Sequence, residues 1–250
     1  MRENTFPKCQ RGILCLTFDD ARYTQWLPLL PEFSRFNAHC TFFFDKEIDA
    51  NAINAMRELI AAGHAVGLHT IHHRNADTGF AELGAEGYMA AELAPQMEAC
   101  RRAGISAPFL GYPNGRSTPE IDRYMLESAG FERLRVHTGI TLAKCKAFAD
   151  YDDFYVDAHR AAGLRAIPSG VFGADFYGTT QANLDAAIAR IARRNELLCL
   201  TSHGISDHPG PVDVHIDMLR EVMRSATRQG VRMCSFADLD CSFADLDKLS

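Results

Sequence analysis

The sequence of 250 residues lacks the marks of several protein classes. No apolar run approaches the ~18–20 residues that cross a bilayer, so we predict no transmembrane helix. The polar opening, residues 1–11, has no apolar core of a signal peptide, which favours a cytoplasmic protein. Positive charge is not in excess: 26 Lys and Arg stand against 32 Asp and Glu, a net charge of −6. We therefore expect no nucleic-acid partner and no membrane partner.

The sequence also has no Cys-x-x-Cys pair, although it contains 8 cysteines. Several of them lie within apolar segments, as Cys15, Cys40, Cys199 and Cys234 do. Free cysteine is among the most buried residue types, and disulfides are rare in the cytoplasm. We therefore predict buried, reduced thiols rather than a disulfide framework.

Short apolar runs alternate with segments of helical periodicity. Hydrophobic residues make up 47% of the chain and charged residues 23%, as in an ordinary globular protein. Helical spacing is clear over 53–60, 184–191 and 218–223, and Gly63 and Gly230 stand where two of these helices should end. Strands are expected at 13–18, 40–44, 65–68, 107–110, 134–136, 197–200 and 231–236. This alternation predicts an α/β fold with a parallel sheet, barrel-like or doubly wound.

No Pro-, Gly- or Ser-rich linker divides the chain, so we expect a single domain over 1–250. Near its end the heptapeptide 234–240 is followed at once by an identical copy, 241–247. Only one copy can form the final strand and turn, and we assign the repeat no function. We find no heptad pattern that would predict an oligomer, and the oligomeric state stays open.

Polar residues follow the ends of several predicted strands. Asp19 and Asp20 follow the first, the segment His69-Thr70-Ile71-His72-His73 follows the third, and His203 follows a late strand. The carboxyl ends of parallel strands gather at one end of a barrel. We therefore expect these side chains to share one opening.

The spacing of His69 and His73 would place both imidazoles on one face of a helical turn. With Asp20 they would form a two-histidine, one-carboxylate metal site. His72 would point elsewhere, to the surface or behind a ligand. Asp19 then serves as a proton acceptor or caps the next helix, and His203 is a general acid or an ordinary histidine at a strand end.

Three segments together resemble the polysaccharide deacetylase family, the NodB-like carbohydrate esterases. They are Thr17-Phe18-Asp19-Asp20, His69-Thr70-x-x-His73 and a late Leu-x-x-His that ends at His203. The strand Cys40-Thr41-Phe42-Phe43-Phe44 and the approach 63–69 support the resemblance, which covers about 12–240 with a poorly matched middle. It implies a distorted (β/α) barrel of about seven parallel strands.

The resemblance also implies roles for single residues. Asp20, His69 and His73 would hold one divalent metal ion, usually zinc. Asp19 would be the general base that deprotonates the metal-bound water, and His203 the general acid for the leaving amine. In the third motif, Tyr112 and the backbone N–H of Asn114 would bind the substrate and its oxyanion.

The chain departs from the family pattern in three places. The third motif, 111–115, lacks its leading Arg, which would sit beside the base and tune it. The fourth motif has only a weak counterpart in 150–154, where the roles of Asp150 and Asp153 are open and an acidic turn is the simpler interpretation. Asp45 stands where the family tends to have a small residue, and such a carboxylate would favour a cationic or amine-bearing substrate.

Four functions remain open at this point. The first is a metal-dependent hydrolase that removes an acyl group, typically acetyl, from an N-acylated sugar or polysaccharide. The second is a cytoplasmic amidohydrolase for a small non-sugar amide or cyclic imide. The third is a non-catalytic carbohydrate-binding relative, and the fourth is a ferrous site for oxygen chemistry. The adjacent base and the late histidine favour hydrolysis over oxygen chemistry.

Overall fold

The computed structural model describes residues 11–137, 148–173 and 179–240. Its strands are β1 Ile13–Phe18, β2 Cys40–Phe44, β3 Ala65–Leu68, β4 Phe109–Gly111, β5 Arg133–His137, β6 Tyr155–Asp157, β7 Ala166–Val171, β8 Glu196–Ser202, β9 Ile205–Ser206, β10 Val214–His215 and β11 Arg232–Met233. Its α-helices are α1 Tyr23–Trp26, α2 Leu30–Arg35, α3 Ala50–Ala61, α4 Ala76–Tyr88, α5 Ala94–Arg102, α6 Pro119–Glu127, α7 Gln181–Arg194 and α8 Ile216–Arg228.

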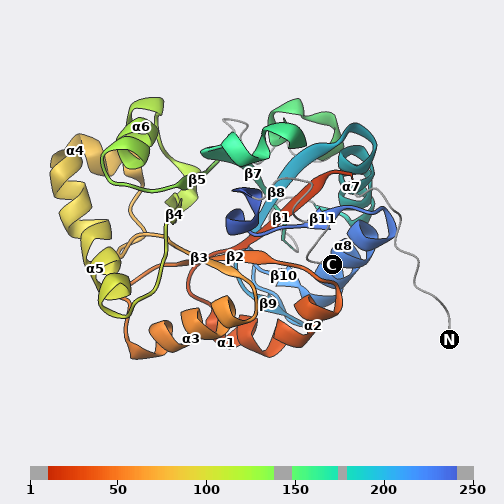
Figure 1. Cartoon of the computed structure of the whole chain (residues 1–250), viewed down its shortest axis with the longest axis horizontal. Coiled ribbons are helices and arrows are strands. Elements are labelled where there is room, and N and C mark those ends of the chain that lie inside the picture. Colours follow the sequence, from red (N-terminus) through yellow and green to blue (C-terminus); the bar gives the residue numbers. More distant parts are fainter. Residues whose placement is uncertain (1–10, 138–147, 174–178, 241–250) are drawn as a thin grey trace.

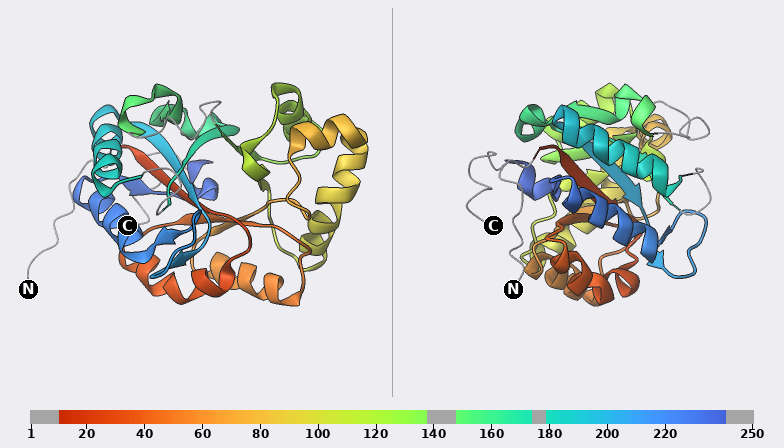
Figure 2. Two further views of the ribbon diagram at one scale, coloured as in Figure 1. Left: turned by 180° about the vertical axis from the view of Figure 1, so that it is seen from behind. Right: turned by 90° about the vertical axis from the view of Figure 1, so that its right-hand side faces the viewer.

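Seven parallel strands close into a barrel. They run in the order β1-β2-β3-β4-β5-β7-β8, and β8 pairs back onto β1 from Ile13↔Leu197 to Phe18↔Ser202. Figure 1 shows α1 to α3 below the strands, α4 to α6 on one side, and α7 and α8 on the other. In the views of Figure 2 the strands again lie inside the ring of helices. The distorted barrel that the sequence predicts is confirmed.

Strand alternation divides the apolar residues into two layers. Leu14 and Leu16 of β1 belong to the layer between barrel and helices. Cys15, between them, points into the barrel with Phe43 and Cys199. Successive strand residues face opposite sides, so each buried strand needs apolar residues on both faces. This explains why the barrel strands are continuous apolar runs.

Three parts of the sheet differ from the sequence prediction. β6 is not expected from the sequence, and it pairs antiparallel with β8. β7 is a barrel strand that the sequence does not reveal, because Pro168, Ser169 and Gly170 interrupt its apolar pattern. The expected last strand, 231–236, is a strand only at β11. The chain then turns inward, and Phe236 packs against Phe43 and Phe109, with ring centroids 5.9 Å apart in each case. This turn belongs to the first copy of the repeat; the second copy lies outside the described residues.

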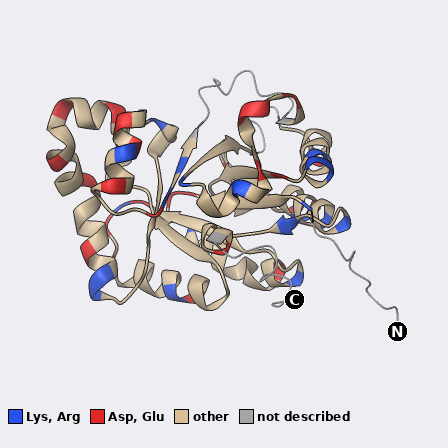
Figure 3. Cartoon of the chain, turned by 45° about the horizontal axis from the view of Figure 1, so that its top comes forward, with Lys and Arg blue, Asp and Glu red and all other residues tan. Residues whose placement is uncertain are grey.

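Other expectations hold within the described part of the chain. Gly63 and Gly230 follow α3 and α8 with φ of +87° and +67°, the left-handed conformation that ends many helices. The cysteines there are buried and free, as expected: Cys15, Cys40, Cys100, Cys199 and Cys234. None of the described helices has the length and apolar character needed to cross a membrane. Charges of both signs are interspersed over the surrounding helices (Figure 3).

Candidate active site

The two aspartates after β1 point in different directions because the backbone turns between them. The Asp19 N–H donates to Ser202 O at 3.0 Å and so extends the β1–β8 pairing by one residue. Asp20 and Ala21 then adopt φ of +70° and +47°. Asp19 is left in the barrel interior, 3% exposed, whereas Asp20 lies at the opening. The two neighbouring carboxylates therefore lie in different surroundings.

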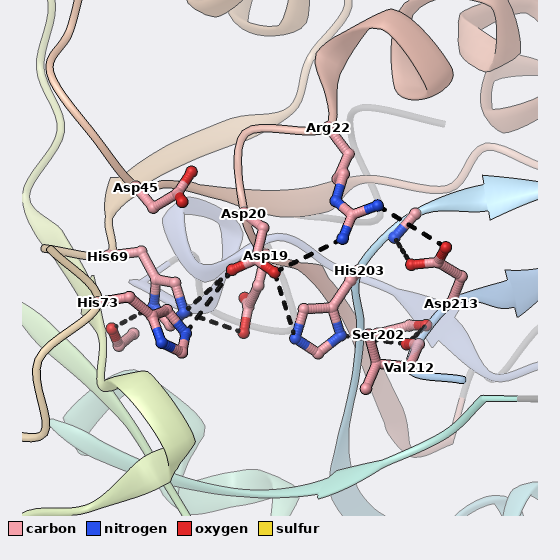
Figure 4. Close-up of polar contacts among 12 residues, drawn as sticks. Asp19, Asp20, Arg22, Asp45, His69, His73, Ser202, His203, Val212 and Asp213 are labelled. Carbon is pink, nitrogen blue, oxygen red and sulfur yellow. Dashed lines mark hydrogen bonds and ion pairs between the residues drawn. The ribbon is translucent and has the colours of Figure 1, made fainter. Parts of the chain in front are cut away.

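Asp20 meets both predicted histidines. Its Oδ1 lies 3.7 Å from His69 Nε2 and 3.7 Å from His73 Nε2. Figure 4 shows the two imidazoles side by side, both turned toward the Asp20 carboxylate. In a tetrahedral site with metal–ligand bonds of about 2.0–2.2 Å, ligand atoms are about 3.4 Å apart. The spacing therefore suits one metal ion held between the three side chains.

The local backbone of this pair is not the helical turn that the spacing predicts. Residues 69–75 form an irregular loop between β3 and α4. Thr70 and His73 adopt φ of +65° and +53°. The two imidazoles converge because left-handed residues fold the loop back on itself, so the predicted helical turn is wrong although its consequence holds.

Hydrogen bonds orient the loop. His69 Nδ1–H donates to Gly111 O at 2.7 Å, because a carbonyl only accepts, and Nε2 is left without a proton to face Asp20. Burial lowers the pKa of His69 to about 4, which keeps the imidazole neutral. Glu92, in the π-helical segment Met89–Leu93, accepts the His72 N–H at 2.9 Å. His72 itself points outward with 68% of its side chain exposed, as predicted.

The donor set fits a divalent cation. Asp20 Oδ1 and His69 Nε2 are both buried, and neither has a hydrogen-bond partner among the described residues. Buried polar atoms in native structures are paired, so two such atoms facing each other indicate a missing partner of positive charge. Two neutral imidazoles and one carboxylate are the ligands of many catalytic zinc sites.

Arg135 of β5 is the site residue that the sequence analysis missed. It is 1% exposed, and its Nη1 lies 2.8 and 2.7 Å from the two oxygens of Asp19. It supplies from β5 the guanidinium that the third motif lacks. Although burial alone would raise the pKa of Asp19, Arg135 holds that pKa below its usual value. The signal was present: Arg133 and Arg135 alternate in a buried strand, so both point into the barrel.

His203 reaches the same opening from the end of β8. Its Nδ1–H donates to Val212 O at 3.1 Å, and its Nε2 lies 3.8 Å from Asp20 Oδ2 (Figure 4). The Trp26 indole N–H donates to His203 O at 2.9 Å. These contacts fix the imidazole with Nε2 toward the cluster of Asp20, His69 and His73.

The third motif (111–115) and the weak fourth motif (150–154) supply no side chain to the group formed by Asp20, His69 and His73. The Tyr112 ring is buried in the outer apolar layer, and its carbonyl lies 3.4 Å from Arg135 Nη2. Asn114 adopts φ of +51° and its side chain donates to Asn75. No hydrogen bond within the described residues joins it to Asp20, His69 or His73. Asp152 of the weak fourth motif pairs with Arg190 of α7 at 2.6 Å, as an acidic surface turn would.

Comparisons with known proteins agree with this geometry. Residues 8–134 match the family model described as polysaccharide deacetylase. No curated protein matches the sequence.

Solved structures resemble the whole chain at low identity. A Mycobacterium smegmatis protein assigned as a polysaccharide deacetylase is 17% identical over 97% of this chain and 93% of its own, with a TM-score of 0.63. The chitin deacetylase of Colletotrichum lindemuthianum is 18% identical over 92% and 88%, with a TM-score of 0.61. A family 4 carbohydrate esterase pseudoenzyme from Bacillus anthracis is 14% identical over 92% and 66%, with a TM-score of 0.56. At these identities the likeness establishes the fold.

Proposed function

Because the chain belongs to the polysaccharide deacetylase family, whose members are hydrolases of carbon–nitrogen bonds other than peptide bonds, we propose that it removes the acetyl group from an N-acetylated sugar or polysaccharide. One observation carries this proposal. The two carboxylates and three imidazoles of the family motifs meet at one end of the barrel, with Asp20 within 4 Å of His69, His73 and His203, and Asp19 within 4 Å of His69.

Asp20, His69 and His73 would hold one divalent ion, for which we propose zinc. Such an ion supplies Lewis-acid chemistry, since it polarises an acyl oxygen and makes water more acidic. The Gly111 carbonyl orients His69 for this role through the ring N–H on the other side of the imidazole. Ligand histidines are commonly held in this way.

Asp19 is the proposed general base. Arg135 keeps it ionised, and it accepts a proton from the water whose oxygen forms the new bond to the acyl carbon. His203 is the proposed general acid. Its Nδ1–H donates to Val212 O, so Nε2 is the ring nitrogen that faces the site. In the imidazolium form Nε2 also carries a proton, which the leaving nitrogen receives as the carbon–nitrogen bond breaks. The products are acetate and the free amino sugar.

The experiment that tests this proposal is Asp19→Asn, assayed for acetate release from N-acetylglucosamine oligosaccharides. Removing a general base typically costs about 10²–10⁴ in rate. We expect a loss of this size with the metal content unchanged. Asp207→Asn, at an exposed position after β9, is the control and should keep full activity. An Asp19→Asn enzyme as active as the unmodified protein would refute the assignment of the base.

Two other functions stay open for specific reasons. The departures in 111–115 favour a different substrate, a small amide or cyclic imide, which a substrate panel would reveal. The structural likeness to a pseudoenzyme keeps sugar binding without turnover in view. Binding of N-acetylated sugars with no acetate release at any metal loading would support that function.

A further inference from the structure

Asp45 is a buried carboxylate at the active-site opening that takes no part in the proposed metal binding or proton transfer. It follows β2 directly and is 7% exposed. Its Oδ1 is buried and has no hydrogen-bond partner within the described part of the chain. The nearest cation is Lys46, whose Nζ lies 3.7 Å from Oδ2, beyond hydrogen-bonding distance. Asp45 therefore stands ready to accept a hydrogen bond that no described residue provides.

Such an arrangement is costly unless something else supplies the donor. Burying a carboxylate removes its hydration, and buried acceptors in native structures are almost always paired with protein, water or ligand. Neighbouring contacts hold the backbone of Asp45 in place. Buried Gln96 of α5 donates to Phe44 O at 3.1 Å and to Lys46 O at 2.6 Å. The carboxylate is thus held on a fixed segment rather than on a free surface loop.

Asp45 lines a pocket that continues from the metal cluster. The pocket has a volume of about 330 Å³ and is lined by Asp20, Ala21, Arg22, Thr24, Asp45, Lys46 and His73. It shares Asp20 and His73 with the cluster, and Figure 4 shows Asp45 beside these residues. Ligand pockets start at about 300 Å³, so there is room for one sugar ring. A group bound here would lie next to the reacting acyl group.

The charges around Asp45 select the kind of group. Arg22 and Lys46 balance Asp20 and Asp45, and a divalent ion at the cluster would make the whole positive. An ammonium group is therefore disfavoured, contrary to what Asp45 alone suggested from the sequence. Arg22 and Lys46 only donate hydrogen bonds and Asp45 only accepts them. A neutral group that does both, a hydroxyl, matches this lining.

We propose that Asp45 is a specificity-determining residue that accepts a hydrogen bond from a hydroxyl group of the sugar ring bearing the acylamino group. The inference rests on the proposed function for the identity of the sugar. The sugar ring would lie on the His73 side of the site, away from His203. Substrates without ring hydroxyls cannot donate this hydrogen bond, so Asp45 does not increase the affinity for them.

The test measures binding separately from turnover. The dissociation constant of tri-N-acetylchitotriose is measured by calorimetry in zinc-loaded protein carrying Asp19→Asn, with and without Asp45→Asn or Asp45→Ala. A hydrogen bond to a charged group is strong enough that we expect at least about a tenfold weaker complex. Glu47→Gln removes an exposed carboxylate two residues away and should leave the affinity unchanged.

Three results would overturn the proposal. Unchanged affinity in both Asp45 variants would show that water, not sugar, satisfies the carboxylate. Loss of zinc from Asp45→Asn would make Asp45 a metal ligand. Tighter, Asp45-dependent binding of a partly deacetylated oligosaccharide would identify an ammonium as the recognised group. Failure of the deacetylase function itself would appear differently, as no acetate release from N-acetylated sugars by the zinc-loaded protein with Asp19 and Asp45 intact.

Discussion

The pair of Asp19 and Arg135 predicts a large, non-additive effect on stability. Arg135→Met would leave the Asp19 carboxylate buried without its guanidinium partner, although His69 Nε2 still lies 3.6 Å from Asp19 Oδ2. Breaking a buried ion pair by removing one partner costs about 3–5 kcal/mol. In a chain of this size each kcal/mol lowers the melting temperature by about 2–4 °C. We therefore expect a melting temperature about 6–20 °C lower.

The double variant Asp19→Asn, Arg135→Met should be much less damaged than the sum of the two single variants. It buries neither charge, so the unpaired-charge penalty disappears. The assay is urea unfolding with a chelator present, so that a metal ion near Asp19 does not replace the lost cation. Arg133→Met is the matched control. Arg133 lies on the same strand, is equally buried and donates to backbone carbonyls such as Leu164 O and Phe236 O.

The control should destabilise the barrel without any coupling to Asp19→Asn. The decisive quantity is the coupling free energy from the double-mutant cycle. Additive losses for Asp19 and Arg135 would show that the bidentate contact contributes no more than the packing of its two side chains. The explanation of how the base is held would then be wrong.

Three further predictions concern the proposed metal ligands, the hydrogen bond of Glu92 and the pair of His39 and Asp238. His69→Ala should abolish zinc binding and His72→Ala should retain it, as measured by metal analysis; equal retention would exclude the proposed ligand set. Glu92→Ala removes the acceptor of the His72 N–H and should weaken zinc binding about 10–100-fold without changing the stoichiometry. An unchanged affinity would show that this hydrogen bond does not help to position His69 and His73. The side-chain hydrogen bond with Asp238 raises the pKa of His39 above 6.5. Its stabilisation is thus complete below pH 6.5 and lost as the pH rises through the higher folded value, so urea unfolding should separate His39→Gln from the unmodified protein more at pH 5 than at pH 9.

The sequence predicts the barrel well where its strands are uninterrupted. β1, β2 and β3 have the predicted bounds, because strands buried on both faces are apolar at every position. β7 escapes prediction because Pro168 and Gly170, residue types that are depleted within strands, interrupt its apolar pattern, and its strand is defined by pairing with β5 and β8. Local composition cannot show this, since the pairing partners β5 and β8 lie far away in the sequence.

The sequence predicts which residues form the candidate site, but it does not predict the backbone conformations that bring them together. Asp20, His69 and His73 meet as expected, yet by left-handed turns rather than a helix. Arg135 could not be assigned from motif order, because the guanidinium comes from a neighbouring strand of the barrel. An arginine on β5 in place of one in the third motif keeps the positive charge beside Asp19 although its position in the sequence differs.

The residues with left-handed backbone conformation around the opening affect how the protein could be stabilised by substitution. Thr70 is β-branched, and a φ of +65° is strained for such a side chain, typically by about 1–3 kcal/mol. At this rim of the barrel opening, tertiary contacts hold residues in backbone conformations that their side chains disfavour. Stabilising substitutions should therefore be easiest to find there. A Thr70→Gly change would relax that strain and also loosen the loop that aligns His69 with His73. Selection for heat resistance alone would thus tend to trade metal alignment for stability at this rim, while the barrel beneath it stays unchanged.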